Sequence, residues 1–333
     1  MRKLLWLILI AVVVYSGYWL VGAKSTERAI AGWISARGAE GWQAEYDDLR
    51  TGGFPLRFDT TITALSLADP ATGVAYAAPR LEINSASYAP TALSAAFASG
   101  ATFATPLQRI DITHDRAGAD LFMDAGPNLT LDVAAFALEN LTVTSTLGWG
   151  VTLAQGAFDT KRHADTPLTH DIRFTARDFR PDDGVMEKLD IDGVLSDRFE
   201  QLDIALTATF DAPWDIHALE GARPQPTRID IDTFAAKWGA LDLQIAGGFD
   251  VDARGTATGK IALKARNWRE MIEIATATGL IPADMKSLAL RAGQVLAGLK
   301  GNAETIDADL TLADGMIVLG FIPIGPAPNF TIR

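Results

Sequence analysis

Cysteine is absent from the 333 residues, histidine occurs only four times, and 29 lysines and arginines face 41 aspartates and glutamates. A chain without cysteine has no disulfide framework, no thiolate metal ligand and no thiol nucleophile. The histidines are far apart and include no i, i+4 pair of the kind that binds zinc in metalloproteases. We interpret each as a surface or strand-end residue: His114, His163, His170 and His217. The sequence therefore predicts no metal site and no cofactor.

Motifs for catalysis are also scarce. The Gly-x-Ser-x-Gly elbow of the hydrolases does not occur. Residues 255–260 resemble a phosphate-binding loop, but three residues separate the glycines instead of four, and Ile261 follows where a serine or threonine would bind the metal. We predict that the protein is not an enzyme. A carbohydrate-processing enzyme is the rival reading, and it would need two carboxylates about 5–9.5 Å apart in one cleft.

Basic clusters are missing as well. The formal net charge is −12, and without Arg2, Lys3 and Lys24 the remainder of the chain carries −15. Affinity for nucleic acid comes mainly from lysines and arginines that neutralise phosphates, so nucleic acid is excluded as a partner. Electrostatic adhesion to anionic lipid headgroups is disfavoured for the same reason.

One long apolar run is present at the N-terminus. Leu4 to Val21 contains no charged residue, and 18 helical residues span about 27 Å, close to the ~30 Å hydrocarbon thickness of a bilayer. Trp6, Tyr18 and Trp19 stand near its ends, as aromatic residues do at membrane interfaces. We predict a transmembrane anchor over residues 1–24. A cleaved signal peptide is the alternative, although the run is long for one and lacks a good cleavage site.

The flanking charges predict the orientation of this anchor. Arg2 and Lys3 precede the run, and positive residues stay in the cytoplasm. We therefore expect a bacterial inner-membrane protein with a cytoplasmic N-terminus and with the bulk of the chain in the periplasm. Residues 25–38 have the apolar spacing of a stalk helix, and residues 39–333 are expected to form one β-rich domain.

Apolar and polar residues alternate with a period of two over much of the remaining chain. This pattern is typical of antiparallel strands with one apolar and one solvated face. Turn residues separate the runs, among them Gly247-Gly248 and Asp314-Gly315. The fold class that we predict is mainly β: a long antiparallel meander of roughly twelve to fifteen strands that forms a curved, groove-like sheet.

Two amphipathic helices are expected late in the chain, at about 268–278 and 283–299. Asn267 can cap the first, and Pro282 suits the first turn of the second. A helix is about 10 Å wide and strands lie about 4.8 Å apart, so two helices cover about four strands. The rest of the apolar face must close on itself as a sandwich or barrel, or remain an open groove. In the open case the lining residues are Leu202, Ile204, Leu206, Leu241, Leu243, Ile245, Ile261 and Leu263.

Several short motifs occur in a fixed order along nearly the whole chain: Gly41-Trp42, Thr51-Gly52-Gly53-Phe54-Pro55-Leu56-Arg57, Ala78-Pro79-Arg80-Leu81, Trp238-Gly239, Asn267-Trp268 and Leu312-Ala313-Asp314-Gly315. This order resembles the bacterial membrane-anchored family known as domain of unknown function 2125, which is distantly similar to AsmA-like envelope proteins. The resemblance supplies no catalytic residue. It implies an inner-membrane protein whose periplasmic sheet forms an apolar groove associated with lipid traffic or outer-membrane maintenance.

The sequence and the resemblance lead to two functional hypotheses. The first is a non-enzymatic cell-envelope protein that binds or shields the acyl chains of phospholipid or another lipid in its groove and supports outer-membrane lipid homeostasis. The second is a non-catalytic scaffolding module with a closed β core that binds envelope proteins.

Overall fold

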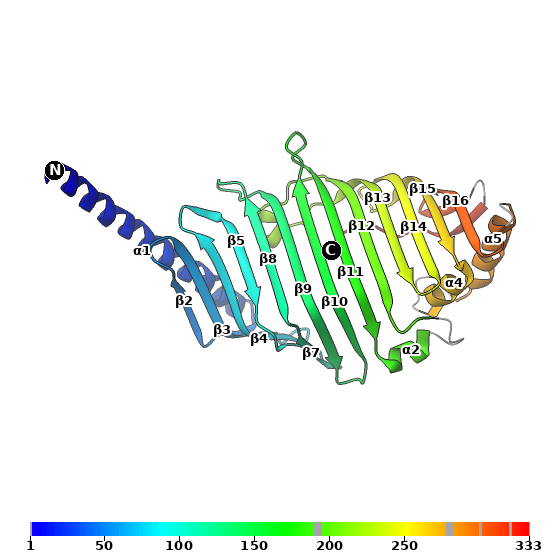
Figure 1. Cartoon of the computed structure of the whole chain (residues 1–333), viewed down its shortest axis with the longest axis horizontal. Helices are drawn as coiled ribbons and strands as arrows, with labels where there is room; N and C mark the ends of the chain where they lie inside the picture. Colours follow the sequence, from blue (N-terminus) through cyan, green and yellow to red (C-terminus); the bar gives the residue numbers. More distant parts are fainter. Residues whose placement is uncertain are drawn as a thin grey trace. The chain divides into compact units, whose positions relative to one another are not determined.

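A computed structural model describes residues 2–189, 195–277, 281, 283–299, 302–319 and 322–332. These residues form five helices and eighteen strands (Figure 1). They divide into two compact units. Unit 1 comprises Met1–Met123 and Phe136–Gly148, and unit 2 comprises Asp124–Ala135 and Trp149–Arg333. The division falls within strand β9 (Leu131–Ser145).

Unit 1 begins with one long helix, α1 (Arg2–Ala39), which contains both the predicted anchor and the predicted stalk. Its first part consists almost entirely of exposed apolar side chains, whereas Ile34 is buried against Ile62 and Leu65 of β3. The strands of this unit, besides its part of β9, are β1 (Gln43–Glu45), β2 (Asp48–Gly52), β3 (Arg57–Asp69), β4 (Val74–Ala86), β5 (Ala89–Phe97), β6 (Ala101–Ala104), β7 (Arg109–Thr113) and β8 (Arg116–Met123).

The sheet of unit 1 branches at β4. One edge of β4 pairs with β3, and its other edge is shared between β5, which pairs along residues 81–86, and β6, which pairs along residues 75–77. Strand β5 continues the sheet through β8, and β6 continues it through β7 to β9. All of these pairings are antiparallel. A seam therefore opens between the two branches.

Unit 2 is a simple meander in which each strand pairs with the next in antiparallel fashion. Its strands are β10 (Gly150–Arg162), β11 (Thr169–Pro181), β12 (Phe199–Phe210), β13 (Pro226–Trp238), β14 (Leu241–Val251), β15 (Ala257–Arg266), β16 (Thr305–Ala313), β17 (Met316–Leu319) and β18 (Ile322–Pro326). Its helices are α2 (Asp183–Leu189), α3 (His217–Glu220), α4 (Trp268–Ala277) and α5 (Lys286–Leu299).

The predicted fold class is confirmed in its main features: a mainly β chain, an antiparallel meander, a long apolar N-terminal helix and two helices near the C-terminus. The strands outnumber the prediction because β1, β2, β6, β7, β17 and β18 have only three to five residues, too few to show an alternating pattern. The chain also forms α2, a helix that the sequence analysis did not predict. The carboxylate of Asp182 accepts a hydrogen bond from the amide of Val185 and caps this helix.

Two details of the late part of the chain differ from expectation. Gly247-Gly248 is no turn but lies in the middle of β14, where φ of Gly247 is +130° and a Cβ would stand 2.5 Å from the carbonyl oxygen of Lys260. The glycine thus permits a close approach of two strands.

Helix α5 begins at Lys286 because residues 283–285 form turns. The proposed helix start at Pro282 and the end of the first helix at residue 278 lie outside the described residues. The predicted tight turn at Asp314-Gly315 is present, with positive φ at both positions.

Candidate functional site

The apolar residues of unit 2 collect on one face of its sheet. Residues directly opposite each other on paired strands point to the same face, and the registers of β10 to β16 align successive apolar residues. One such row crosses seven strands: Phe158, Phe174, Ile204, Phe234, Ile245, Leu263 and Ala308. We call the face that carries this row the apolar face of unit 2.

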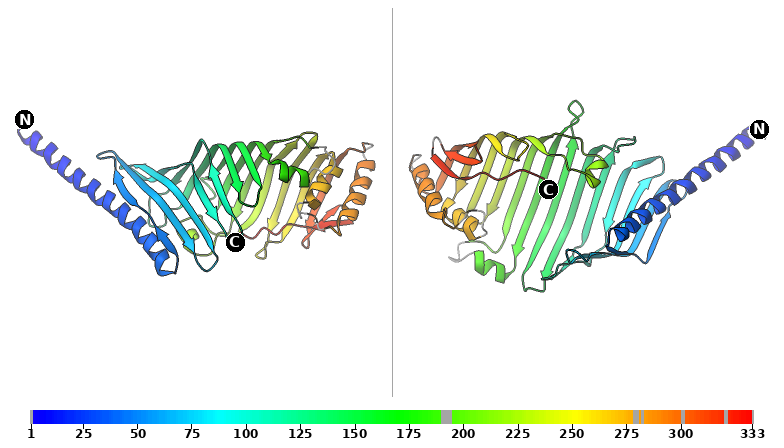
Figure 2. Two further views of the ribbon diagram at one scale, coloured as in Figure 1. Left: turned by 90° about the horizontal axis from the view of Figure 1, so that it is seen from below. Right: turned by 180° about the vertical axis from the view of Figure 1, so that it is seen from behind.

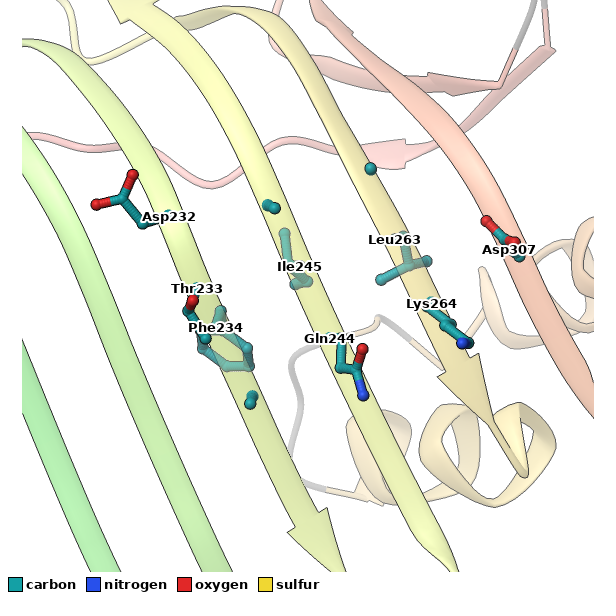
Figure 3. Close-up of a pocket in the computed structure, with 11 residues that line it drawn as sticks. Asp232, Thr233, Phe234, Gln244, Ile245, Leu263, Lys264 and Asp307 are labelled. Atoms are coloured by element: carbon teal, nitrogen blue, oxygen red, sulfur yellow. The ribbon is translucent and has the colours of Figure 1, made fainter.

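The eight residues predicted to line a groove all lie on this face. They come from β12, β14 and β15, and the register brings them together through β13. Leu241 is buried, and the other seven are half-buried: Leu202, Ile204, Leu206, Leu243, Ile245, Ile261 and Leu263. Figure 3 shows Ile245 and Leu263 on neighbouring strands beside Phe234 of β13.

Strand β13 contributes residues that the sequence analysis missed. Ala205 of β12 pairs with Thr233 and the next residue, Leu206, pairs with Ile231, so Asp232 is an extra residue in β13. This bulge keeps both Ile231 and Phe234 on the apolar face. A strict alternation would have placed one of them on the opposite face, and for that reason the pattern did not identify β13.

Two covers lie on the apolar face of unit 2. At one end of the strands, Trp268 of α4 and Leu296 and Ala297 of α5 pack with Ala265 of β15 and Ile306 of β16. The indole nitrogen of Trp268 donates a hydrogen bond of 3.0 Å to the carbonyl oxygen of Ala303. These helices cover β14 to β16, which agrees with the small width that two helices can shield.

The second cover is the C-terminal segment after β18, which crosses the strands of unit 2 (Figure 2, right). Phe330 packs against Phe249 with a ring separation of 4.8 Å, within a cluster that includes Val251, Ala257 and Leu312. Main-chain hydrogen bonds hold the segment in place: the amide of Phe330 donates to the carbonyl oxygen of Gly255, over 2.9 Å. The sequence analysis did not predict this cover, because residues far apart in the chain form it.

Between the two covers lies a band of apolar residues that belongs to neither packed cluster: Leu202, Ile204, Leu206, Phe234 and Ile245. All five are half-buried. We call these residues the open band. The opposite face behind it holds a shallow hollow of about 280 Å³ over the small residues Ala246 and Ala262, with polar groups of Asp232, Gln244 and Lys264 around it (Figure 3).

Unit 1 contains a separate apolar pocket of about 340 Å³ at the seam where β5 and β6 diverge. Leu65, Tyr76 and Leu81 form one wall, and Phe97 and Phe136 meet edge to face with ring centroids 6.2 Å apart. Burial raises the pKa of Tyr76. The volume lies within the range of about 300–1,000 Å³ that is usual for small-molecule sites.

One polar atom in the lining of this pocket has no partner. Nδ1 of His114 is buried and makes no hydrogen bond, although the backbone amide of the same residue donates to the hydroxyl of Ser99. A buried polar atom without a partner is costly. The sequence analysis did not predict this pocket, because the branching of the sheet depends on pairing between distant strands.

A second hollow of unit 1, about 250 Å³, lies where α1 crosses the same face. Tyr18, Gly22 and Thr26 of α1 line one side, and Phe58 and Leu93 of the sheet line the other. Unit 1 therefore has two hollows on the face that α1 only partly covers.

The predicted anchor residues have different surroundings. Trp6 is exposed, whereas Trp19 is buried against Phe58 and donates a hydrogen bond from its indole nitrogen to the carbonyl oxygen of Arg57, over 2.7 Å. The hydroxyl of Tyr18 donates to the carbonyl oxygen of Ser87 over 2.6 Å. The last turns of the apolar run are thus attached to the sheet.

The polar faces carry ion pairs between arginines and carboxylates two residues apart on one strand, where side chains point to the same side. Arg228 contacts both Asp230 and Asp250, and the hydrogen bonding that its guanidinium donates to the carboxylate of Asp230 is the main reason why the pKa of Arg228 is raised. Similar pairs join Arg57 to Asp59 and Arg109 to Asp111. Among the described residues, no group of three histidines and carboxylates is placed to bind a metal ion.

Comparison with protein families gives a match over residues 19–328 to a family described as uncharacterized protein conserved in bacteria, domain of unknown function 2125. The chain belongs to this family. The resemblance stated from the sequence motifs is therefore confirmed. No curated protein and no solved structure matches the chain. Of the described helices, α1 is long and apolar enough to cross a membrane, and a signal sequence would pass the same test.

Proposed function

We propose that this member of the family is a non-catalytic protein of the bacterial cell envelope that binds or shields lipid acyl chains on its apolar sheet faces. In this proposal α1 anchors it in the inner membrane, the N-terminus is cytoplasmic, the sheets are periplasmic, and the protein supports outer-membrane lipid homeostasis. The observation that carries the proposal is the open band of unit 2, whose large side chains lie outside both packed clusters.

The physical argument rests on the cost of leaving such a band in water. Removing apolar surface from water contributes about 25 cal/mol per Å², and exposed apolar patches of several hundred Å² commonly mark binding sites. An acyl chain is flexible and purely apolar, so it can follow a row of side chains without specific polar partners. The branched and aromatic side chains of Ile204, Phe234 and Ile245 form such a row across three strands.

The pocket of unit 1 supports the same function with a different geometry. Its lining is mostly apolar, which suits an apolar segment of a lipid, and the polar side chains in that lining belong to Tyr76, Arg80 and His114. A mostly apolar lining with a few polar groups is typical of ligand sites.

The test is to purify the full chain in mild detergent and to identify lipid that remains bound by native mass spectrometry and by extraction. The double variant Ile204→Ser/Ile245→Ser is expected to retain less lipid per chain, because it makes the open band polar. Gln244→Ser is the matched control, since Gln244 is exposed and adjoins Ile245 on the same strand but points to the opposite face.

Equal lipid content in wild type, the double variant and the control would contradict binding at the open band. Complete absence of lipid from the wild type, together with a crosslinked envelope protein, would support the scaffolding hypothesis instead.

A further inference from the structure

The length of α1 that is free of the sheet is shorter than a membrane. The contacts of α1 with the sheet begin at Tyr15, whose hydroxyl lies 2.8 Å from the hydroxyl of Ser87. Residues 2–14 precede this contact, and 13 helical residues measure only about 20 Å. The hydrocarbon core of a bilayer is about 30 Å thick and needs about 20 residues. A span that starts at Leu4 therefore continues to about Ala23, well past the first contact with the sheet.

The exposed side of α1 agrees with this longer span. Leu20 and Val21 are 57% and 67% exposed, and the next charged residue is Lys24, which pairs with Glu27. The helix thus carries no charged residue over the nine residues 15–23 beside the sheet. If residues 15–23 of α1 lie within the bilayer, the edge of the sheet that contacts them lies at the same depth in the bilayer.

That edge consists of two turns with exposed apolar side chains. Phe54 and Leu56, between β2 and β3, are 55% and 60% exposed, and Tyr88, between β4 and β5, is 78% exposed. The turns adjoin each other, because the amide of Ser87 donates to the carbonyl oxygen of Leu56 over 2.9 Å. We call these two turns, residues 53–56 and 87–88, the apolar edge.

Several polar groups at the apolar edge are paired within the protein. Ser87 is fully buried, and its hydroxyl donates to the carbonyl oxygen of Pro55 over 3.0 Å. Its own carbonyl oxygen accepts from Tyr18, and that of Arg57 accepts from Trp19. Backbone groups that enter a membrane must be paired in this way, because lipid offers no hydrogen bonds.

We propose that the apolar edge of unit 1 is inserted into the interfacial region of the bilayer from which α1 emerges, with Phe54, Leu56 and Tyr88 in contact with lipid. The inference rests on the proposed membrane anchor and adds a second, peripheral contact to it. Aromatic side chains favour the membrane interface, and the Arg57–Asp59 and Lys24–Glu27 pairs mark the level at which charged groups begin.

The absence of cysteine allows a direct test. Single variants Phe54→Cys, Leu56→Cys and Tyr88→Cys carry an environment-sensitive fluorophore, and the labelled full chain is reconstituted into phosphatidylcholine vesicles with bromine atoms at shallow or deep acyl positions. Leu107→Cys is the matched control, because Leu107 is also on a turn of unit 1 and is 81% exposed. Its turn follows β6, which pairs with the beginning of β4, whereas Ser87 follows the other end of β4. Leu9→Cys reports on the span itself.

We expect the label at positions 54, 56 and 88 to shift its emission to shorter wavelength and to be quenched more by shallow than by deep bromines, whereas position 107 shows neither effect. Position 9 should be quenched more by deep bromines. If positions 54, 56 and 88 resemble position 107 while position 9 is quenched, insertion of the apolar edge is wrong and the anchor stands. If position 9 is not quenched either, both the inference and the membrane anchor are wrong.

Discussion

The two units carry sheets with one apolar face, but they cover these faces to different extents. In unit 2, Trp268 and Phe330 belong to covers that pack over the two ends of the strands and leave the open band between them. In unit 1, the second half of α1 packs over β1 to β3, and hollows remain beside it and at the seam of the sheet. The alternation of residues along a strand determines that one face of the sheet is apolar, whereas segments distant in sequence determine how much of that face remains uncovered.

Removal of the largest covering side chain of unit 2 should show how far this unit depends on its cover. Trp268 is 2% exposed, and its ring lies where a Cβ on Gly293 would stand. We expect Trp268→Ala to lower the free energy of unfolding by about 3–5 kcal/mol, since a large cavity replaces the ring. Chemical denaturation in detergent measures the change. Trp33→Ala, at a 47% exposed position of α1, should lower the free energy of unfolding far less. Equal decreases in the two variants would mean that α4 and α5 do not stabilise unit 2.

Enlarging one alanine in each unit compares a packed face with a hollow one. Ala265 is 4% exposed within the cluster around Trp268, so Ala265→Leu should cost about 1–3 kcal/mol through overpacking. Ala98 lines the pocket of unit 1, and Ala98→Leu should change stability by less than about 0.5 kcal/mol. Denaturation curves of the two variants give the comparison. A large loss for Ala98→Leu would show that this pocket is closed in solution.

Loss of the C-terminal cover should have a smaller, local effect. Phe330 is half-buried on Phe249, so Phe330→Ala should destabilise the chain by about 1–2 kcal/mol, less than the ~3–5 kcal/mol of a fully buried phenylalanine. Hydrogen exchange followed by mass spectrometry should become faster in β14 and β15. The exposed Pro328→Ala is the control, and unchanged exchange in the Phe330 variant would mean that the segment does not protect these strands.

The smallest expected effect concerns pH. His170 of unit 2 is 2% exposed, and burial is the main reason why its pKa is lowered. As the pH falls below the ordinary value of about 6.5, the unfolded chain takes up the proton before the folded chain does, so stability decreases. A difference of one bound proton between the unfolded and folded chains lowers the free energy of unfolding by at most about 1.4 kcal/mol per pH unit. His170→Gln should flatten the pH dependence of stability, and exposed His217→Gln should leave it as in the wild type. Equal slopes in all three proteins would contradict this role of His170.

The strands with regular alternation could be predicted from the sequence, and Leu202, Ile204 and Leu206 of β12 are the clearest example. Strand β13 could not, because the bulge at Asp232 interrupts its period. Gly247-Gly248 was read as a turn because a glycine pair gives the same local signal in a turn and in a close approach of strands. The apolar face was thus predicted from local pattern, while its covers and the pocket of unit 1 depend on pairing and packing between distant residues.

Helix α1 runs without interruption from Arg2 to Ala39, so its two halves move as one rigid body. Side chains on its second half are fixed to β3 through Ile34, and those in its middle through Trp19 and Tyr18. No flexible joint separates the part that projects from the part that packs. Any tilt or rotation of the projecting half is therefore transmitted directly to the strands of unit 1 and sets the angle at which their hollows face the surroundings.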